Sequence, residues 1–96
     1  SGSHFAGSEI GHMIVGSNFY RCNCGNNGCL ETFASATAMI KYAAHRLEVD
    51  GIKSSMENIN AKTIFEAAKK GDQLGIETVD RMIKHLSIGI INVFNI

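Results

Sequence analysis

All three cysteines of the chain lie within one stretch of eight residues, and a histidine precedes the first of them by ten positions. The cysteines are Cys22, Cys24 and Cys29, and the histidine is His12. Zinc favours four nitrogen or sulfur ligands in a tetrahedron, and one imidazole with three thiolates is a common closed set in structural sites. The spacing therefore predicts a zinc loop over residues 12–29 with these four side chains as its ligands.

The residues between the cysteines suit a tight loop around an ion. Gly25 and Gly28 lie where the chain must reverse, and glycine readily adopts the positive φ of such turns. The C-x-C-x4-C spacing differs from that of common zinc fingers, so three reduced cysteines in an ordinary loop are the alternative interpretation. Unligated cysteines are usually dispersed and buried, whereas these lie among Asn and Gly residues, which favours the metal.

Two elements must position these ligands. Residues 12–15 form a short apolar run between two glycines and predict a strand that anchors His12. Apolar residues then recur every three or four positions from Cys29 to Val49, which predicts a helix. Its apolar stripe consists of Leu30, Phe33, Ala34, Thr37, Ile40, Ala44 and Leu47. The positive end of this helix would favour the Cys29 thiolate and hence its ligation.

The second half of the chain predicts two more helices. Asn60 is a suitable N-cap for a helix that runs to Lys70, and Gly71 is a suitable stop. The inward-facing residues of this helix are predicted to be Ile64, Phe65 and Ala68. Asp72 then starts a third helix, and residues 88–94 at its end are apolar almost all round. Such a segment needs other protein surface to cover it.

Composition limits the possible functions. Nine basic and nine acidic residues give no net charge, and no basic run indicates a nucleic-acid groove. The odd number of cysteines argues against a disulfide framework, and the chain has neither a signal-peptide core nor an apolar run that could cross a membrane. We expect a cytoplasmic protein that contacts neither membrane nor nucleic acid through these 96 residues. They suffice for one domain at most.

Two segments carry a resemblance to a known family: E-x-G-H at residues 9–12 and C-x-C-G-x-x-G-C-L-E at residues 22–31. Together they resemble the signature of the ROK family, which comprises bacterial sugar kinases and sugar-responsive repressors. The resemblance implies that residues 1–96 are a single partial domain, one internal segment of a longer protein with an actin-like, ribonuclease H-like fold. The expected class is α+β and mostly helical: a short strand, the zinc loop, then three helices.

The resemblance also implies roles for individual residues. Glu9, His12 and Glu31 would contact hydroxyls of a bound sugar, and ionised carboxylates are suitable acceptors for hydroxyl donors. His12 and the three cysteines would hold a structural zinc ion, which has no open position for substrate. The parent protein would use ATP and Mg²⁺ and would be a homo-oligomer. Its catalytic Asp and phosphate loop would precede residue 1, so no catalytic residue is expected here and the segment alone should be inactive.

Three functions remain in competition. The first is an ATP-dependent hexose kinase of glucokinase type, and the second is a sugar-sensing ROK transcriptional repressor. Both would use the same residues of this segment, so they differ only in what the parent carries upstream: a phosphate loop or a DNA-binding domain. The third is a stand-alone zinc module for protein contacts, which the uncovered end of the third helix disfavours.

Overall fold

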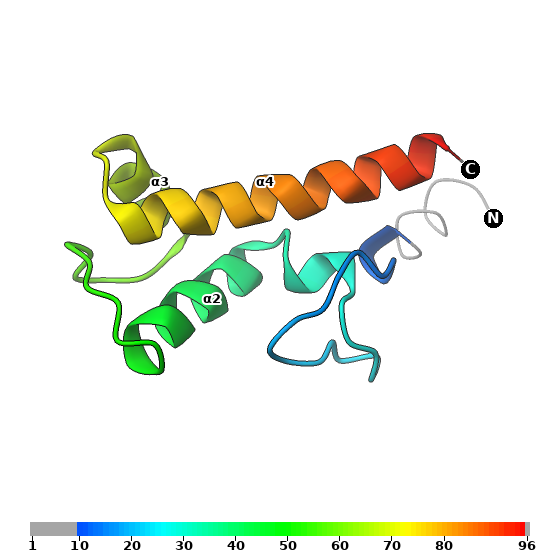
Figure 1. The fold of residues 1–96 in the computed structure, drawn as a ribbon, viewed down its shortest axis with the longest axis horizontal. Helices are drawn as coiled ribbons and strands as arrows, with labels where there is room; N and C mark the ends of the chain where they lie inside the picture. The colour runs from blue at the N-terminus through cyan, green and yellow to red at the C-terminus, as the bar shows by residue number, and fades with distance from the viewer. Residues whose placement is uncertain (1–9, 96) are drawn as a thin grey trace.

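The computed structural model describes residues 10–95. The elements in chain order are the 3₁₀ turn η1 (Leu30–Thr32) and the helices α2 (Ala36–Glu48), α3 (Ala61–Lys69) and α4 (Gln73–Phe94). Figure 1 shows α2 running antiparallel to α4, with α3 packed at the N-terminal end of α4. Residues 12–29 fold as a loop beneath the C-terminal half of α4.

Two apolar clusters hold these parts together. The three helices enclose the first, whose buried members are Met39, Ala43, Ile64 and Leu74. The second joins the loop region to η1 and α4, and its buried members are Val15, Leu30 and Phe33. Ile88 of α4 packs against this second cluster. The loop with the predicted metal ligands is therefore attached to α4 by buried apolar contacts.

The boundaries of α3 and α4 confirm the sequence-based prediction. The Asn60 side chain accepts a hydrogen bond from the Thr63 amide, and the Thr63 hydroxyl interacts in return with the Asn60 backbone. Gly71 ends this region with φ 91°. Asp72 caps α4 by accepting a hydrogen bond from the Gly75 amide. Side-chain oxygens thus satisfy amides that the first turn of each helix leaves unpaired.

The predicted continuous helix from Cys29 to Val49 is wrong. The chain makes the short turn η1, breaks at residues 33–35 and begins α2 only after Ser35. The Ser35 hydroxyl donates to the Glu31 carbonyl and accepts from the Ala38 amide. These local bonds compete with helix continuation. The buried residues of α2 are Ala38, Met39 and Ala43, while Ile40 and Leu47 of the predicted stripe are half-buried and pack against the first cluster.

The predicted strand over residues 12–15 is also absent as a regular element. Among residues 10–95 there is no sheet, only two isolated antiparallel bridges, Ile14 with Cys29 and Arg21 with Asn27. The segment does lie extended beside the start of η1 through two backbone hydrogen bonds, from Val15 to Gly28 and from Leu30 to Met13. This pairing is too short to form a ladder, but it fixes the separation between His12 and the cysteines.

The C-terminal half of α4 leaves large apolar side chains in solvent, as expected for a segment that needs cover. They are Ile83, Leu86, Ile90, Ile91 and Phe94. Ile64 of α3 is buried as we predicted, but Phe65, which we also predicted to face inward, is 46% exposed, and Ala67 is buried in its place. No helix within residues 10–95 is both long and apolar enough to cross a membrane.

Candidate metal centre and adjoining pocket

The structure brings the four predicted metal ligands together. One ligand atom each from His12, Cys22, Cys24 and Cys29 lies within 4.8 Å of the other three. The Sγ atoms of Cys24 and Cys29 are 3.5 Å apart, and Cys22 Sγ lies 3.5 Å from His12 Nδ1. In a tetrahedral zinc site with Zn–S bonds of about 2.3 Å, two sulfurs are about 3.8 Å apart. The residues present therefore fit a closed four-ligand zinc site.

Backbone geometry of the loop sets these positions. Gly25 and Gly28 both have φ 94°, a backbone angle that residues with a Cβ atom rarely adopt. A Cβ atom on Gly28 would lie 1.8 Å from the Gly16 carbonyl oxygen, whereas one on Gly25 would meet no atom within 4 Å. The close approach at Gly28 brings the segment around Val15 against Cys29. The two glycines expected from the sequence thus have different roles: one only turns the chain, and the other also allows close packing.

The three thiols differ in acidity when no metal is bound. A hydrogen bond from the Asn26 backbone, with the neighbouring Cys29 thiol, lowers the pKa of Cys24 to about 7. Burial and the two other sulfurs raise the pKa of Cys29 to about 12. For Cys22, the Cys24 backbone lowers the pKa, but the contact with Glu31 and burial raise it on balance. A metal cation would have to displace the protons of the two buried thiols as it binds.

The expectation that a helix start favours the Cys29 thiolate is therefore wrong for the metal-free chain. Cys29 precedes a turn of only three residues, and its side chain makes no capping hydrogen bond. The residue is fully buried, and burial disfavours a charged sulfur. Burial therefore disfavours a free Cys29 thiolate, whereas a bound cation would neutralise the charge of the thiolate and remove this penalty.

One of the other two predicted sugar contacts, Glu31, adjoins the cluster. Its Oε1 lies 3.0 Å from Cys22 Sγ and 3.7 Å from His12 Nδ1. The side chains of His12 and Glu31 are 42% and 47% exposed, so both remain open to solvent. The second predicted contact, Glu9, lies outside the residues that the structure describes.

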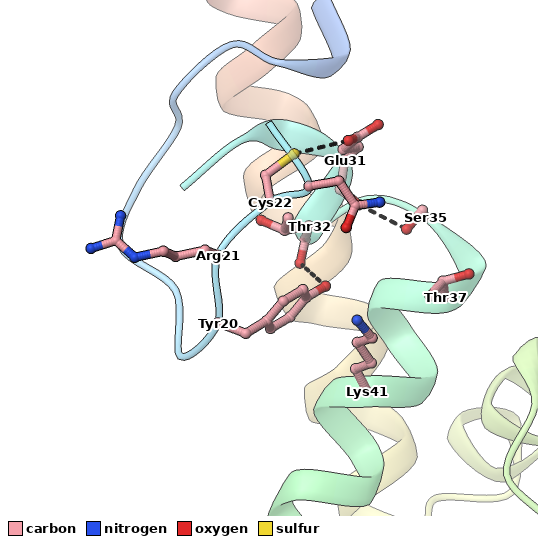
Figure 2. Close-up of a pocket in the computed structure, with 9 residues that line it drawn as sticks. Tyr20, Arg21, Cys22, Glu31, Thr32, Ser35, Thr37 and Lys41 are labelled. Carbon is pink, nitrogen blue, oxygen red and sulfur yellow. Dashed lines mark hydrogen bonds between the residues drawn. The ribbon is translucent and has the colours of Figure 1, made fainter. Parts of the chain in front are cut away.

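Glu31 also lines a hollow of about 300 Å³ on the side of the cluster that faces α2. Figure 2 shows the lining side chains, with Tyr20 and Lys41 reaching toward Thr32 while Arg21 extends away from them. The Tyr20 hydroxyl donates to the Thr32 carbonyl, and the Lys41 ammonium lies 4.5 Å from the centre of the Tyr20 ring. The hollow thus combines a carboxylate, a cation, hydroxyls and one aromatic face.

Sequence reasoning did not find the far wall of this hollow. Tyr20 is one of several polar loop residues without a distinguishing pattern, and Lys41 is simply a charged residue off the apolar stripe. Thr37 was predicted to face the core, but it lies in the wall of the hollow because α2 begins after Ser35. The lining depends on where the helix begins, which the periodicity alone did not show.

The two histidines on the helices have structural roles. His85 of α4 stacks on Phe33 with ring centroids 3.8 Å apart, and its Nδ1 lies 2.8 Å from the Arg81 carbonyl. His45 of α2 stacks on Phe19 of the loop at 4.2 Å. Both imidazoles pack against aromatic rings and take no part in the cysteine cluster.

Comparisons with known proteins identify what the chain is similar to. The family model for the ROK family matches residues 1–96. A glucokinase of Thermotoga maritima is 38% identical over 98 aligned residues, which cover 93% of this chain and 31% of that protein. The DNA-binding transcriptional dual regulator NagC of Escherichia coli strain K12 is 42% identical over 92 residues, which cover 91% of this chain and 22% of that protein.

The fold has solved counterparts in the same group. The crystal structure of a ROK family transcriptional regulator, described as a homologue of the E. coli MLC protein, superposes with a TM-score of 0.80 at 34% identity. The match covers 90% of this chain and 22% of that structure. The chain thus spans between about a fifth and a third of the length of these relatives. They include both an enzyme and transcriptional regulators.

Proposed function

The chain belongs to the ROK family, and on that basis we propose that it is the zinc-loop and sugar-contact segment of an ATP-dependent hexose kinase of glucokinase type. The observation that carries this proposal is the position of Glu31: its carboxylate borders both the cysteine cluster and the adjoining hollow. An ionised carboxylate that is open to solvent can accept hydrogen bonds from two sugar hydroxyls. Glu9 is proposed as a second carboxylate contact.

His12 is proposed to contribute to both functions of the site. Its Nδ1 faces the cluster, 3.5 Å from Cys22 Sγ, which leaves Nε2 for a hydrogen bond outside it. A bound zinc ion, held by His12, Cys22, Cys24 and Cys29, would supply fixed geometry and no Lewis acidity, because four protein ligands close its coordination. Holding one ring nitrogen of a histidine sets the tautomer and orientation of the other. His12 would then present a defined donor to a sugar oxygen.

The Tyr20 side of the hollow fits the same class of ligand. A sugar has hydroxyls along its edge and C–H groups on its faces, so it can use both polar groups and an aromatic ring. The hydroxyl-bearing residues of the hollow are Tyr20, Thr32, Ser35 and Thr37. The hollow, at about 300 Å³, lies at the lower end of the range typical of small-molecule pockets.

Phosphoryl transfer requires more than this segment is proposed to supply. A base must accept the proton of the attacking hydroxyl, and Mg²⁺ with donors must neutralise the phosphates of ATP. In the proposed parent protein, a catalytic Asp and a phosphate loop outside these residues provide those parts, on an actin-like fold. This segment would fix the sugar for in-line attack, which is itself a large part of such catalysis. The parent is proposed to be a cytoplasmic homo-oligomer.

A second candidate is a sugar-sensing transcriptional repressor, in which the same residues bind an inducer. The observation in its favour is the similarity to NagC, which is 42% identical to this chain. A regulator structure also superposes well on the chain, with a TM-score of 0.80. The two candidates are distinguished by the parent's other residues: phosphate-loop glycines with a catalytic Asp identify a kinase, and a DNA-binding helix-turn-helix identifies a repressor.

Glu31→Gln in the full-length protein tests the sugar site. This variant keeps the shape of the side chain but removes the charge, and hydrogen bonds to charged groups contribute about 1.5–3 kcal/mol. We expect sugar affinity measured by calorimetry to fall by about tenfold or more, while the zinc content stays the same. Glu57→Gln, at an exposed loop position remote from the cluster, is the matched control. Unchanged sugar affinity in Glu31→Gln would refute the assigned role.

A further inference from the structure

Arg81 of α4 connects that helix to the loop that carries the metal ligands. Its Nη2 donates to the Asn18 side-chain oxygen at 2.7 Å, across 63 positions of sequence. The guanidinium also lies over the rings of Phe33 and Tyr42, 4.6 Å and 4.3 Å from their centres. Among residues 10–95, no carboxylate lies within ion-pair distance of Arg81. The ring of Phe19 lies further off, with its centre 5.9 Å from the guanidinium, so three aromatic rings and one amide oxygen surround this cation.

Asn18 in turn is hydrogen-bonded to residues on both sides of Cys29, namely Asn27 and Thr32. Its Oδ1 accepts the Arg81 hydrogen bond, and its Nδ2 donates to the Thr32 carbonyl at 2.8 Å. Its backbone amide donates to Asn27 Oδ1, also at 2.8 Å, and Asn27 Nδ2 donates back to the Asn18 carbonyl. Because an amide has its donor and acceptor at opposite ends, the cation on one side directs the NH₂ group toward Thr32.

The residues that Asn18 holds are next to the ligands themselves. Thr32 follows Glu31 directly and belongs to η1, the turn that starts after Cys29. Its hydroxyl donates to the Cys29 carbonyl at 2.6 Å. Asn27 lies two positions before Cys29 on the other arm. Thr32 and Asn27 are thus both tied to Asn18, Thr32 through the side-chain amide and Asn27 through the backbone, and the side-chain amide is tied to α4.

We propose that Arg81 is a positioning residue for the metal centre: through Asn18 it holds Cys29 and Glu31 in their binding arrangement before any metal is present. This inference rests on the proposed zinc site. The loop over residues 12–29 contains no helix that could fix its shape. Without the bonds through Asn18, the conformational entropy lost on ordering the loop would reduce the free energy of metal binding. Outer hydrogen-bond partners of metal ligands typically change metal affinity by about 10- to 100-fold when they are substituted.

A purely structural role for Arg81 makes a different prediction, and Arg46 provides the comparison. Arg46 lies on α2 and also joins two helices, because its Nε and Nη2 donate to the carboxylate of Glu77 on α4. It makes no hydrogen bond to the loop over residues 12–29. Arg46→Met should therefore lower the free energy of unfolding without selectively weakening the metal site, whereas Arg81→Met should weaken the metal site itself.

Cobalt(II) titration of the 96-residue chain, with competition by zinc, tests this inference. Sulfur-to-cobalt charge-transfer absorption reports thiolate ligation, and circular dichroism reports the helices. We expect Arg81→Met and Asn18→Ala each to weaken metal binding by about tenfold or more. The double variant should bind metal no more weakly than the weaker of the two single variants, because both substitutions remove the same hydrogen bond between Arg81 and Asn18. Arg46→Met should bind cobalt as the unaltered chain does.

The possible outcomes distinguish failure of the role of Arg81 from failure of the proposed metal site. Absence of charge-transfer absorption in the unaltered chain would refute the metal site. Cobalt binding with equal affinity in Arg81→Met and the unaltered chain would refute only the role of Arg81, as would equal weakening by Arg46→Met. Arg81→Lys covers the case in which Arg81→Met does not fold, because it keeps a cation over the rings but lacks the guanidinium fork. It too should bind cobalt more weakly, and unaltered affinity would overturn the inference.

Discussion

Replacing Gly28 with alanine, compared with the same change at Gly25, tests how the loop brings its ligands together. Both glycines have φ 94°, and an alanine in the left-handed region costs about 1–2 kcal/mol. Nothing within 4 Å would meet a Cβ on Gly25, so that cost is the whole effect there. At Gly28 the Cβ would lie 1.8 Å from the Gly16 carbonyl oxygen. The backbone must therefore separate at this point.

The separation has a calculable consequence. It removes the 2.8 Å hydrogen bond from Val15 to Gly28 and strains the 2.7 Å bond from Leu30 to Met13. Each such bond contributes about 1 kcal/mol. The free-energy cost of Gly28→Ala should therefore exceed that of Gly25→Ala by about 2 kcal/mol, which corresponds to a difference of roughly 30-fold in metal affinity.

Competition between zinc and a chromophoric chelator measures this difference directly. We expect Gly25→Ala to weaken zinc binding by no more than its conformational cost of about 1–2 kcal/mol, which is about 5- to 30-fold, and Gly28→Ala to bind zinc roughly 30-fold more weakly than Gly25→Ala. The helical circular dichroism of both should stay the same, because both glycines lie in the loop and outside the helices. Equal zinc affinity of the two variants would refute the argument that close backbone approach at Gly28 forms the site.

Three further predictions concern the helices. Hydrogen bonds, first among them that from the Ser55 amide, hold the pKa of Asp72 below its usual value, so the folded chain binds fewer protons than the unfolded one. The resulting stability is complete above about pH 4 and is lost as pH falls through the lower folded-state pKa. Urea unfolding between about pH 2 and 6 should show this loss for the unaltered chain but not for Asp72→Asn. Identical pH profiles of the two would contradict the role of Asp72. Gly75→Ala should lower the free energy of unfolding by about 1–3 kcal/mol, because its Cβ would lie 2.6 Å from the Ala68 amide nitrogen. A urea midpoint equal to that of the unaltered chain would count against the tight contact of α3 with α4. Phe65→Ser should lower the free energy of unfolding by no more than about 1 kcal/mol, because about half of the side chain is exposed; a larger loss would show that the ring is buried.

The parts of the structure that the sequence predicted are those determined by residue identity or local chemistry. Thiols and an imidazole at short spacing have few other reasons to cluster, so residues 12–29 were found as a unit. Asn60, Gly71 and Asp72 define helix ends through bonds with their own neighbours, so α3 and α4 begin and end as predicted. Such features depend on a few neighbouring residues, so distant contacts in the folded chain do not change them.

The parts that it did not predict depend on competition or on distant contacts. Ser35 interrupts an apolar pattern that otherwise continues, because its hydroxyl bonds outweigh the periodic signal. That interruption places Thr37 in the wall of the hollow beside Tyr20. The bond between Asn18 and Arg81 joins positions 63 residues apart, and no local pattern indicates it.

X-ray absorption at the zinc edge, on chain purified without chelator, tests the metal site most directly. The four residues His12, Cys22, Cys24 and Cys29 predict one zinc per chain, with three sulfur atoms at about 2.3 Å and one nitrogen at about 2.0–2.1 Å. A folded chain without zinc, or a zinc shell with oxygen in place of any of these sulfurs, would contradict it.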